Sequence, residues 1–207
     1  MTAAATDSLE HLRREAASCR ACPLWKNATQ TVFGEGPSDA EIMLVGEQPG
    51  DEEDLTGRPF VGPAGRILDQ CLAAAGLHRN KLFVTNAVKH FKWAPRGKRR
   101  LHQKPSPGEI RACNMWLDLE IERIKPHVIV ALGATGLRAL VRSALTVDAA
   151  RRQALQHESG VVVIASYHPS AILRAKGEGT ARLRATLIED LKRARVLATN
   201  GVDRSFE

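Results

Sequence analysis

The strongest pattern along the chain is a set of four short, nearly continuous apolar runs that are rich in β-branched residues. They are EIMLVG at 41–46, KLFVTNAV at 81–88, HVIVALG at 127–133 and GVVVIASYH at 160–168. Runs without regular polar alternation are typical of strands that are buried on both faces, as in parallel sheets. We therefore expect these runs to form a central four-stranded parallel sheet.

Helical patterns lie between these runs, at about 63–76, 107–124 and 134–143, and a last one lies near 179–197. The sequence Ser106-Pro107-Gly108-Glu109 marks one helix start, because Ser caps a helix, Pro suits its first position and Glu its third. Pro63 marks another start, and Gly76 suits the end of that helix. The alternation of strands and helices predicts a three-layer α/β/α fold.

The length of 207 residues and the hydrophobic content of 43% are sufficient for one compact domain, which we expect to span 1–207. We expect a peripheral helix within 1–14 and a loose tail at 200–207. No apolar run reaches the roughly 20 residues of a membrane span, and the first residues lack the apolar core of a signal peptide. A cytoplasmic protein without membrane association is therefore expected.

The charge balance favours a polyanionic partner. Thirty basic and 23 acidic residues give a formal net charge of +7 and a pI near 9.6. Positive charge is concentrated at 89–104, where KHFKWAPRGKRRLHQK holds seven Lys or Arg residues and no acidic residue. We expect Lys98, Arg99 and Arg100 in this loop to bind phosphates.

Polar and glycine-rich segments follow all four predicted strands. In chain order they are GEQPGDEED, TNAVKH, GATG and SYHPS. The carboxyl ends of parallel strands share one edge of a sheet, and ligands bind in the crevice outside that edge. The sequence therefore predicts a site there, with Glu47, Asn86 and His168 at three of the strand ends.

The four cysteines favour metal ligation, a thiol in the core, or both, over a disulfide framework. Cys19 and Cys22 form a C-x-x-C pair, in which two thiolates reach one metal centre. Cys71 shares a helix face with Ile67 and Leu68, so we expect it to be a small buried residue of the core.

Four of these motifs together resemble the uracil-DNA glycosylase superfamily. They are GEQPG (46–50), GRPFVGPAG (57–65), TNAVKH (85–90) and HPS (168–170), and their order and spacing match over residues 15–195. The iron-sulfur family-4 type has GEAPG, GRPFVG, NVVKCRPP and HPS. A variant branch of it, called UdgX, is more similar still, because it too has GEQPG, KHF and a KRRxH loop.

The resemblance implies a protein that removes uracil from DNA after the base has been extruded into a pocket. Asn86 would recognise the uracil edge, and Phe60 would stack on the base. His168 would hydrogen-bond the uracil oxygen on which negative charge gathers, and Glu47 would stabilise the cationic sugar or orient water. The structural alternatives are a strand-end cap for Asn86, a core side chain for Phe60 and a structural histidine at 168.

Further contacts are implied around these residues. Gln48 and Asp51 would also contact uracil, whereas Ser170 and Arg174 would contact the DNA backbone. The remaining acids of the 47–54 segment are expected to be solvated side chains of a loop; they are Glu52, Glu53 and Asp54.

A metal centre is also implied. Family-4 enzymes hold a 4Fe-4S cluster with four cysteines, and Cys19, Cys22 and Cys113 stand at matching places, but the remaining position is His90. Because imidazole replaces thiolate in some iron-sulfur centres, we expect a 4Fe-4S cluster held by three cysteines and His90. Zinc bound to the same four residues is the rival.

In the UdgX branch the histidine of KRRxH attacks the sugar, and here it corresponds to His102. A neutral imidazole held near the anomeric carbon can capture the cation before water does, leaving a persistent protein–DNA bond. The alternatives are a multiple-turnover family-4 glycosylase that uses a water near Glu47, and a non-catalytic DNA-binding metal module. The expected partner is uracil-containing DNA, including single strands, bound by a monomer at the bacterial nucleoid.

Overall fold

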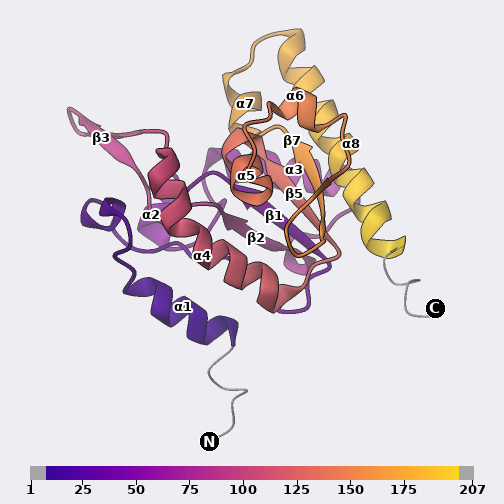
Figure 1. The fold of residues 1–207 in the computed structure, drawn as a ribbon. Coiled ribbons are helices and arrows are strands. Elements are labelled where there is room, and N and C mark those ends of the chain that lie inside the picture. Colours follow the sequence, from indigo (N-terminus) through magenta and orange to yellow (C-terminus); the bar gives the residue numbers. More distant parts are fainter. Residues whose placement is uncertain (1–7, 201–207) are drawn as a thin grey trace, which may run out of the picture.

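The computed structural model describes residues 8–200, which form a sheet between two layers of helices (Figure 1). Half of the expected amino-terminal helix, at 1–7, and the expected tail beyond Asn200 lie outside the described residues. Helix α1 (Leu9–Ala17) begins after Ser8, whose side chain accepts a hydrogen bond from the backbone N–H of His11. Within 8–200, no helix has the length and apolar character needed to cross a membrane.

The sheet has the strand order β2-β1-β5-β7-β6. The four predicted strands pair in parallel as β1 (Ile42–Gly46), β2 (Phe83–Asn86), β5 (Val128–Leu132) and β7 (Val162–Ser166). A fifth strand, β6 (Leu155–Gln156), pairs antiparallel with β7 at one edge. The expected four-stranded parallel sheet is therefore corrected to a mixed sheet of five strands, because a two-residue edge strand has no apolar run that a sequence pattern would reveal.

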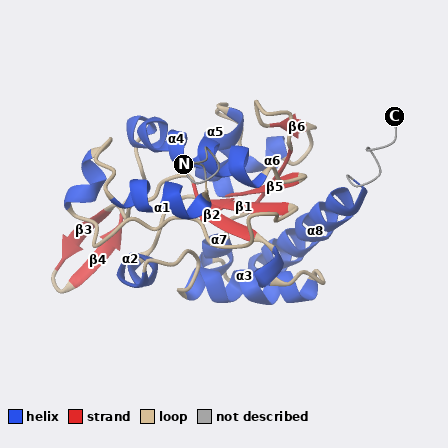
Figure 2. Cartoon of the chain, turned by 90° about the horizontal axis from the view of Figure 1, so that it is seen from below, coloured by secondary structure: helices blue, strands red, loops and turns tan. Residues whose placement is uncertain are grey.

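Helices cover both faces of the sheet, which confirms the three-layer α/β/α prediction (Figure 2). On one face lie α1, α4 (Pro107–Ile124) and α5 (Gly133–Val141), and on the other lie α3 (Pro63–Ala74), α7 (Pro169–Arg174) and α8 (Glu178–Asn200). Successive strand side chains point to opposite faces, so Met43 and Val45 pack with the first set of helices and Leu44 with the second.

The predicted helix ends agree well with the structure. Helix α4 spans the predicted 107–124, and its start is a capping box in which the Ser106 hydroxyl accepts from the Glu109 N–H while the Glu109 carboxylate accepts from the Ser106 N–H. Helix α3 ends at Ala74, and Gly76 follows in the left-handed region at φ 70°.

Several short elements were not predicted. The basic segment expected as a loop contains an antiparallel hairpin of β3 (Trp93–Arg96) and β4 (Arg99–His102). The acidic segment after β1 forms α2 (Asp51–Thr56). The remaining short helices are η2 (Pro23–Lys26), η3 (Arg79–Lys81) and α6 (Val147–Ala150).

A fully buried ion pair joins the segment after β2 to α4. The Lys89 ammonium donates to Glu120 Oε2 at 2.7 Å, to Thr85 Oγ1 at 2.7 Å and to the Asn86 carbonyl at 2.8 Å. The other Glu120 oxygen accepts from the Gly34 N–H at 2.9 Å. Each proton of the ammonium therefore has an acceptor, as a buried charge requires.

We expect Glu120→Ala to lower the free energy of unfolding by about 3–5 kcal/mol, because the Lys89 charge would stay buried without its counter-charge. Urea denaturation measures this loss. The matched control is Glu122→Ala on the same helix, which removes an exposed carboxylate and should change stability by no more than about 0.5 kcal/mol. Equal losses in the two variants would contradict the role given to the pair.

Candidate active site

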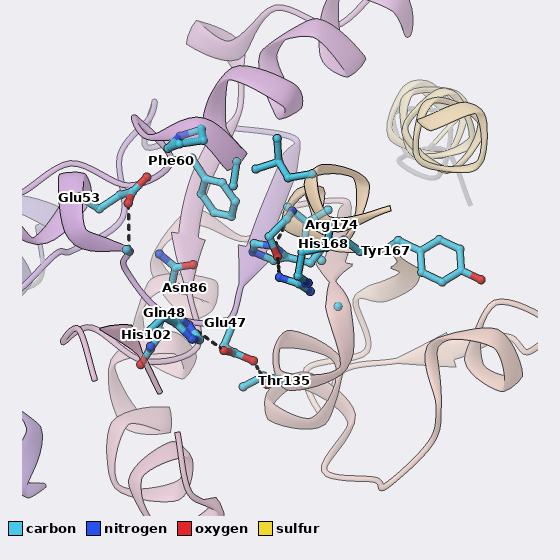
Figure 3. Close-up of a pocket in the computed structure, with 18 of the residues that line it drawn as sticks. Glu47, Gln48, Glu53, Phe60, Asn86, His102, Thr135, Tyr167, His168 and Arg174 are labelled. Carbon is cyan, nitrogen blue, oxygen red and sulfur yellow. Dashed lines mark hydrogen bonds and ion pairs between the residues drawn. The ribbon is translucent and has the colours of Figure 1, made fainter. Parts of the chain in front are cut away.

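The carboxyl ends of the four parallel strands border one pocket, at the edge where the sequence predicts a site (Figure 3). Its lining contains most of the expected site residues, namely Glu47, Gln48, Asp51, Phe60, Asn86, His102, His168, Ser170 and Arg174. The three expected phosphate contacts Lys98, Arg99 and Arg100 do not line it.

Asn86 ends β2 with its side chain almost fully buried beside the end of β1. Its Oδ1 atom is shielded from solvent and has no hydrogen-bond partner. A side chain at Gly46 is excluded, since a Cβ there would lie 2.4 Å from Asn86 Oδ1 and 2.5 Å from Phe60 Cζ. An unpaired buried oxygen costs about 1–3 kcal/mol, which an N–H group of a bound molecule would recover.

Phe60 is held in an unusual backbone conformation, with φ at 53°. The backbone of Phe60 passes close to Gly65, where only glycine fits, because a Cβ at position 65 would lie 1.9 Å from the Phe60 carbonyl oxygen. The Phe60 ring is 5.7 Å from the His168 ring, measured between centroids. A left-handed conformation at a bulky residue costs on the order of 1–3 kcal/mol and is typical of functional sites.

His168 caps the start of α7 and presents one defined tautomer to the pocket. Its Nδ1 accepts a hydrogen bond from the Ser170 N–H at 3.1 Å, and the Ser170 hydroxyl lies 2.8 Å from the same atom. A neutral ring that accepts at Nδ1 carries its proton on Nε2. Burial lowers the pKa of His168 to about 4, although nearby Glu47 acts in the opposite direction. Near neutral pH, His168 is therefore an uncharged N–H donor.

Glu47 connects three elements at the pocket (Figure 3). One carboxylate oxygen accepts from the Thr135 hydroxyl at the start of α5, and the other lies 3.2 Å from His102 Nε2. Burial acts to raise the pKa of Glu47, but hydrogen bonds from His102 and Thr135 outweigh it, so the pKa is lowered. Thr135 was not predicted individually, although it lies in GATG at the third strand end.

Gln48 holds both ends of the β3–β4 hairpin with its side-chain amide. Its Nε2 donates to the carbonyls of Lys92 at 3.2 Å and Gln103 at 3.0 Å, and its Oε1 accepts from the Lys92 N–H at 3.1 Å. Since His102 is the last residue of β4, these bonds place it at the pocket. The amide that the sequence assigns to uracil is thus engaged by the hairpin.

Arg100 anchors the hairpin to α2. Its guanidinium lies 2.6 Å from a carboxylate oxygen of Asp51 and 2.6 Å from one of Asp54. The same group lies over the rings of Phe91 and Trp93, at 5.5 and 5.6 Å from their centroids. Lys98 and Arg99, in contrast, are exposed at the hairpin tip.

The expectation that Glu52, Glu53 and Asp54 are solvated is wrong for Glu53 and Asp54, which are buried, and is confirmed for Glu52. The Glu53 carboxylate accepts from the N–H groups of Gly62 at 2.8 Å and Gly50 at 3.0 Å, so it ties two pocket loops together. Helix α2 turns these two acids inward, and a run of acidic letters alone does not reveal that.

The expected metal ligands have suitable donors around them. The indole N–H of Trp116 donates to Cys19 Sγ at 3.1 Å, and the Lys89 N–H donates to Cys113 Sγ at 3.2 Å. The Thr31 hydroxyl donates to the Ala16 carbonyl at 3.0 Å, so at 3.0 Å from His90 Nε2 it acts as the acceptor. This tautomer leaves the Nδ1 lone pair of His90 available as a ligand, and the residues therefore fit a metal centre.

Three of the four expected ligands lie in one region of the core, where Cys113 is buried and Cys19 and Cys22 pack against the same cluster. Among residues 8–200, no three of Cys19, Cys22, His90 and Cys113 have ligand atoms within 4.8 Å of one another. Cys71 is fully buried in the core beside Leu68 and Leu72, as predicted.

The sequence of this chain is similar to a known protein family and to characterised members of it. The sequence profile of the Uracil DNA glycosylase superfamily matches residues 33–192. The chain is 39% identical over 188 residues to the Type-4 uracil-DNA glycosylase of Thermotoga maritima, covering 90% of this chain and 93% of that protein. It is 39% identical over 200 residues to the Type-4 uracil-DNA glycosylase of Sulfurisphaera tokodaii, covering 93% and 86%.

A more distant relative is the Type-5 uracil-DNA glycosylase of Pyrobaculum aerophilum, which is 32% identical over 186 residues, covering 82% of this chain and 77% of that protein. The family profile covers well over half of the chain, and the relatives match along most of its length. The chain therefore belongs to the uracil-DNA glycosylase superfamily.

Proposed function

We propose that this protein excises uracil from DNA and stays bonded to the resulting abasic sugar through His102. Uracil-DNA glycosylase activity follows from the family and from the Type-4 relatives. The covalent step is the further proposal, together with the UdgX-like character of the chain. The observation that carries it is the contact between His102 and Glu47 at the mouth of the pocket that contains Asn86 and His168.

Recognition of uracil is assigned to Asn86 and Phe60. The unpartnered Oδ1 of Asn86 would accept from the uracil N3–H, and its amide nitrogen would donate to the adjacent carbonyl. Cytosine presents an amino group and a bare nitrogen on that edge, so both contacts would be lost. The Phe60 ring, fixed by its backbone and by His168, would supply the stacking surface.

Cleavage moves the electron pair of the glycosidic bond onto uracil and leaves positive charge on the sugar. The Nε2–H of His168 would donate to the uracil oxygen that becomes more negative as the bond breaks. The Glu47 carboxylate, kept ionised by its hydrogen bonds, would stabilise the cationic sugar. Both groups therefore act more strongly in the transition state than in the ground state.

His102 would complete the reaction in place of water. The lone pair of its unprotonated ring nitrogen would form a bond to C1′ of the sugar as the bond to uracil breaks. The proton on its other nitrogen would then pass to Glu47 or to solvent, leaving a neutral substituted imidazole. This product has no easy leaving group, so the adduct should persist.

The surrounding residues would position the nucleophile and the DNA. Gln48 and the Arg100 contacts with Asp51 and Asp54 would hold the hairpin, which favours an anchoring role for Arg100 over a phosphate contact. The proposed phosphate contacts are the exposed Lys98 and Arg99 at the hairpin tip, together with the half-buried Ser170 and the exposed Arg174 beside the pocket.

Cys19, Cys22, His90 and Cys113 would hold a 4Fe-4S cluster, supported by the donors to two of the sulfurs and by the packing of the three cysteines in one region of the core. When bound, the cluster would supply a structural link between the amino-terminal segment and the residues after β2. We also propose single-stranded uracil-DNA as a substrate, action as a monomer, and a location at the nucleoid.

The state of His168 predicts a pH dependence. Because its pKa is about 4, the ring is uncharged from pH 8 to pH 5 and donates equally well throughout this range. We expect His168→Ala to slow single-turnover uracil release about 10²–10³-fold, and by a constant factor over these pH values. Chromatography of free uracil measures the ratio of the two rates. A ratio that climbs steadily as the pH falls would show that the charged imidazolium is the active form.

The nucleophile is tested on a denaturing gel after incubation with a uracil-containing single strand. The wild type should give a heat-stable protein–DNA band, and His102→Ala should give none while still releasing uracil. Gln103→Ala, an exposed neighbour, is the control and should form the band normally. An adduct in His102→Ala, or multiple turnovers and free abasic DNA in the wild type, would rule out trapping by His102.

The same gel tests the anchor of the hairpin with a matched pair of arginines. Arg100→Ala should slow adduct formation about 100-fold, because a nucleophile displaced by about 1 Å loses that much rate. Arg99→Ala removes the same charge from the exposed tip and should mainly weaken DNA binding in a salt-dependent manner. If the two variants are indistinguishable at saturating DNA, Arg100 acts as a phosphate contact.

Iron and acid-labile sulfide in the purified protein test the cluster. A brown protein with both in stoichiometric amount is expected, and Cys113→Ser should lose both together with the colour. His90→Cys should keep them, since it replaces imidazole by the thiolate found in family-4 enzymes. A colourless wild type that contains only zinc would refute the cluster.

A further inference from the structure

We propose that Asp118, His157 and Glu158 form a second metal site, for a divalent transition-metal ion of the zinc type. Asp118 lies on α4, and the other two residues lie in the turn between β6 and β7. One carboxylate oxygen of each acid and one imidazole nitrogen lie within 4.8 Å of one another. None of these residues lines the uracil pocket, so the site is separate from the proposed reaction.

The buried side chain of His157 has a nitrogen without a binding partner. His157 is only 5% exposed, and its Nε2 is shielded from solvent without a hydrogen-bond partner. The nearest acidic atom, Asp118 Oδ1, is 3.6 Å away, too far for a hydrogen bond. Native proteins seldom leave such an atom unpaired, and a bound cation would satisfy it.

The tautomer of His157 would change when a metal binds. As at His168, the N–H of the serine two residues on donates to Nδ1, here Ser159 at 3.2 Å, so the metal-free ring carries its proton on Nε2, facing the two carboxylates. A metal on Nε2 would replace this proton, and Nδ1 would then carry a proton that the Ser159 hydroxyl, at 2.9 Å, can accept. Metal binding would therefore shift the ring from one tautomer to the other.

The charges around the site favour a cation. The Asn114 amide donates to both oxygens of Asp118 at 3.1 Å and orients this carboxylate. Arg142 lies 2.7 Å from Glu158 and 3.4 Å from Asp118, so one guanidinium faces two carboxylates and one negative charge is not neutralised. The Arg142 side chain is 58% exposed at the end of α5 and has room to move aside for a divalent ion.

The donor set identifies the class of metal. An imidazole nitrogen with two carboxylate oxygens suits zinc and its neighbours, whereas magnesium and calcium prefer oxygen alone. A tetrahedral ion would take water as its fourth ligand. Binding would clamp the β6–β7 turn to α4, the helix that also carries Cys113.

Isothermal titration of the as-isolated protein with Zn²⁺ tests the site, with iron content measured before and after. One additional zinc should bind per chain, whereas Mg²⁺ should give no heat. His157→Gln and Glu158→Gln should each weaken binding at least tenfold, and Glu158 is exposed enough for its variant to fold normally. Arg142→Ala should tighten binding, because it removes the competing guanidinium.

The matched control is Glu122→Gln, which neutralises an exposed acid that lines the same surface cavity but lies outside the cluster. Its affinity for zinc should equal that of the wild type. A zinc ion retained equally by His157→Gln and Glu158→Gln would belong to the cysteines and would overturn the proposal. Absence of any additional zinc in the millimolar range would overturn it as well.

Discussion

The buried ion pair between Lys89 and Glu120 fixes the segment after β2, on which both the pocket and the cysteine site depend. The Lys89 ammonium binds the carbonyl of Asn86, which faces the pocket, and its backbone N–H binds the sulfur of Cys113. His90 follows directly. An ion pair removed from water tolerates little displacement, because either charge left alone in the interior is very costly. The amide of Asn86, proposed to recognise the base, and two of the proposed cluster ligands are therefore held in one rigid arrangement.

The hairpin is attached to this part of the protein at its base and along β4. Gln48 bonds both of its ends, and Arg100 pairs with Asp51 and the buried Asp54. The tip that carries Lys98 and Arg99 is exposed. This division suits the proposed roles, in which His102 would need accurate positioning while the exposed basic side chains at the tip would contact the DNA backbone. It also explains why the segment after β1 is so acidic, since two of its carboxylates serve as anchors for one guanidinium.

Much of the fold was predictable because buried strands and capped helices have recognisable patterns in short stretches of sequence. The four parallel strands read as apolar runs, and α4 began and ended where its capping residues indicated. Elements without such a sequence pattern were not predicted. Strand β6 has only two residues, and the hairpin is polar and lies on an exposed surface. The sequence of α2 is that of a solvated acidic loop, although Glu53 and Asp54 are buried in the structure.

The sequence by itself determined the layer architecture, the edge of the sheet that borders the pocket, and the residue types available there, because strand ends and motifs are properties of short segments. Only the tertiary structure decided how these residues are used. It directed the Gln48 amide to the hairpin, paired Arg100 with two acids, and joined Glu47 to both His102 and Thr135. Such pairings connect positions dozens of residues apart, and their geometry depends on how whole elements pack, which no local pattern encodes.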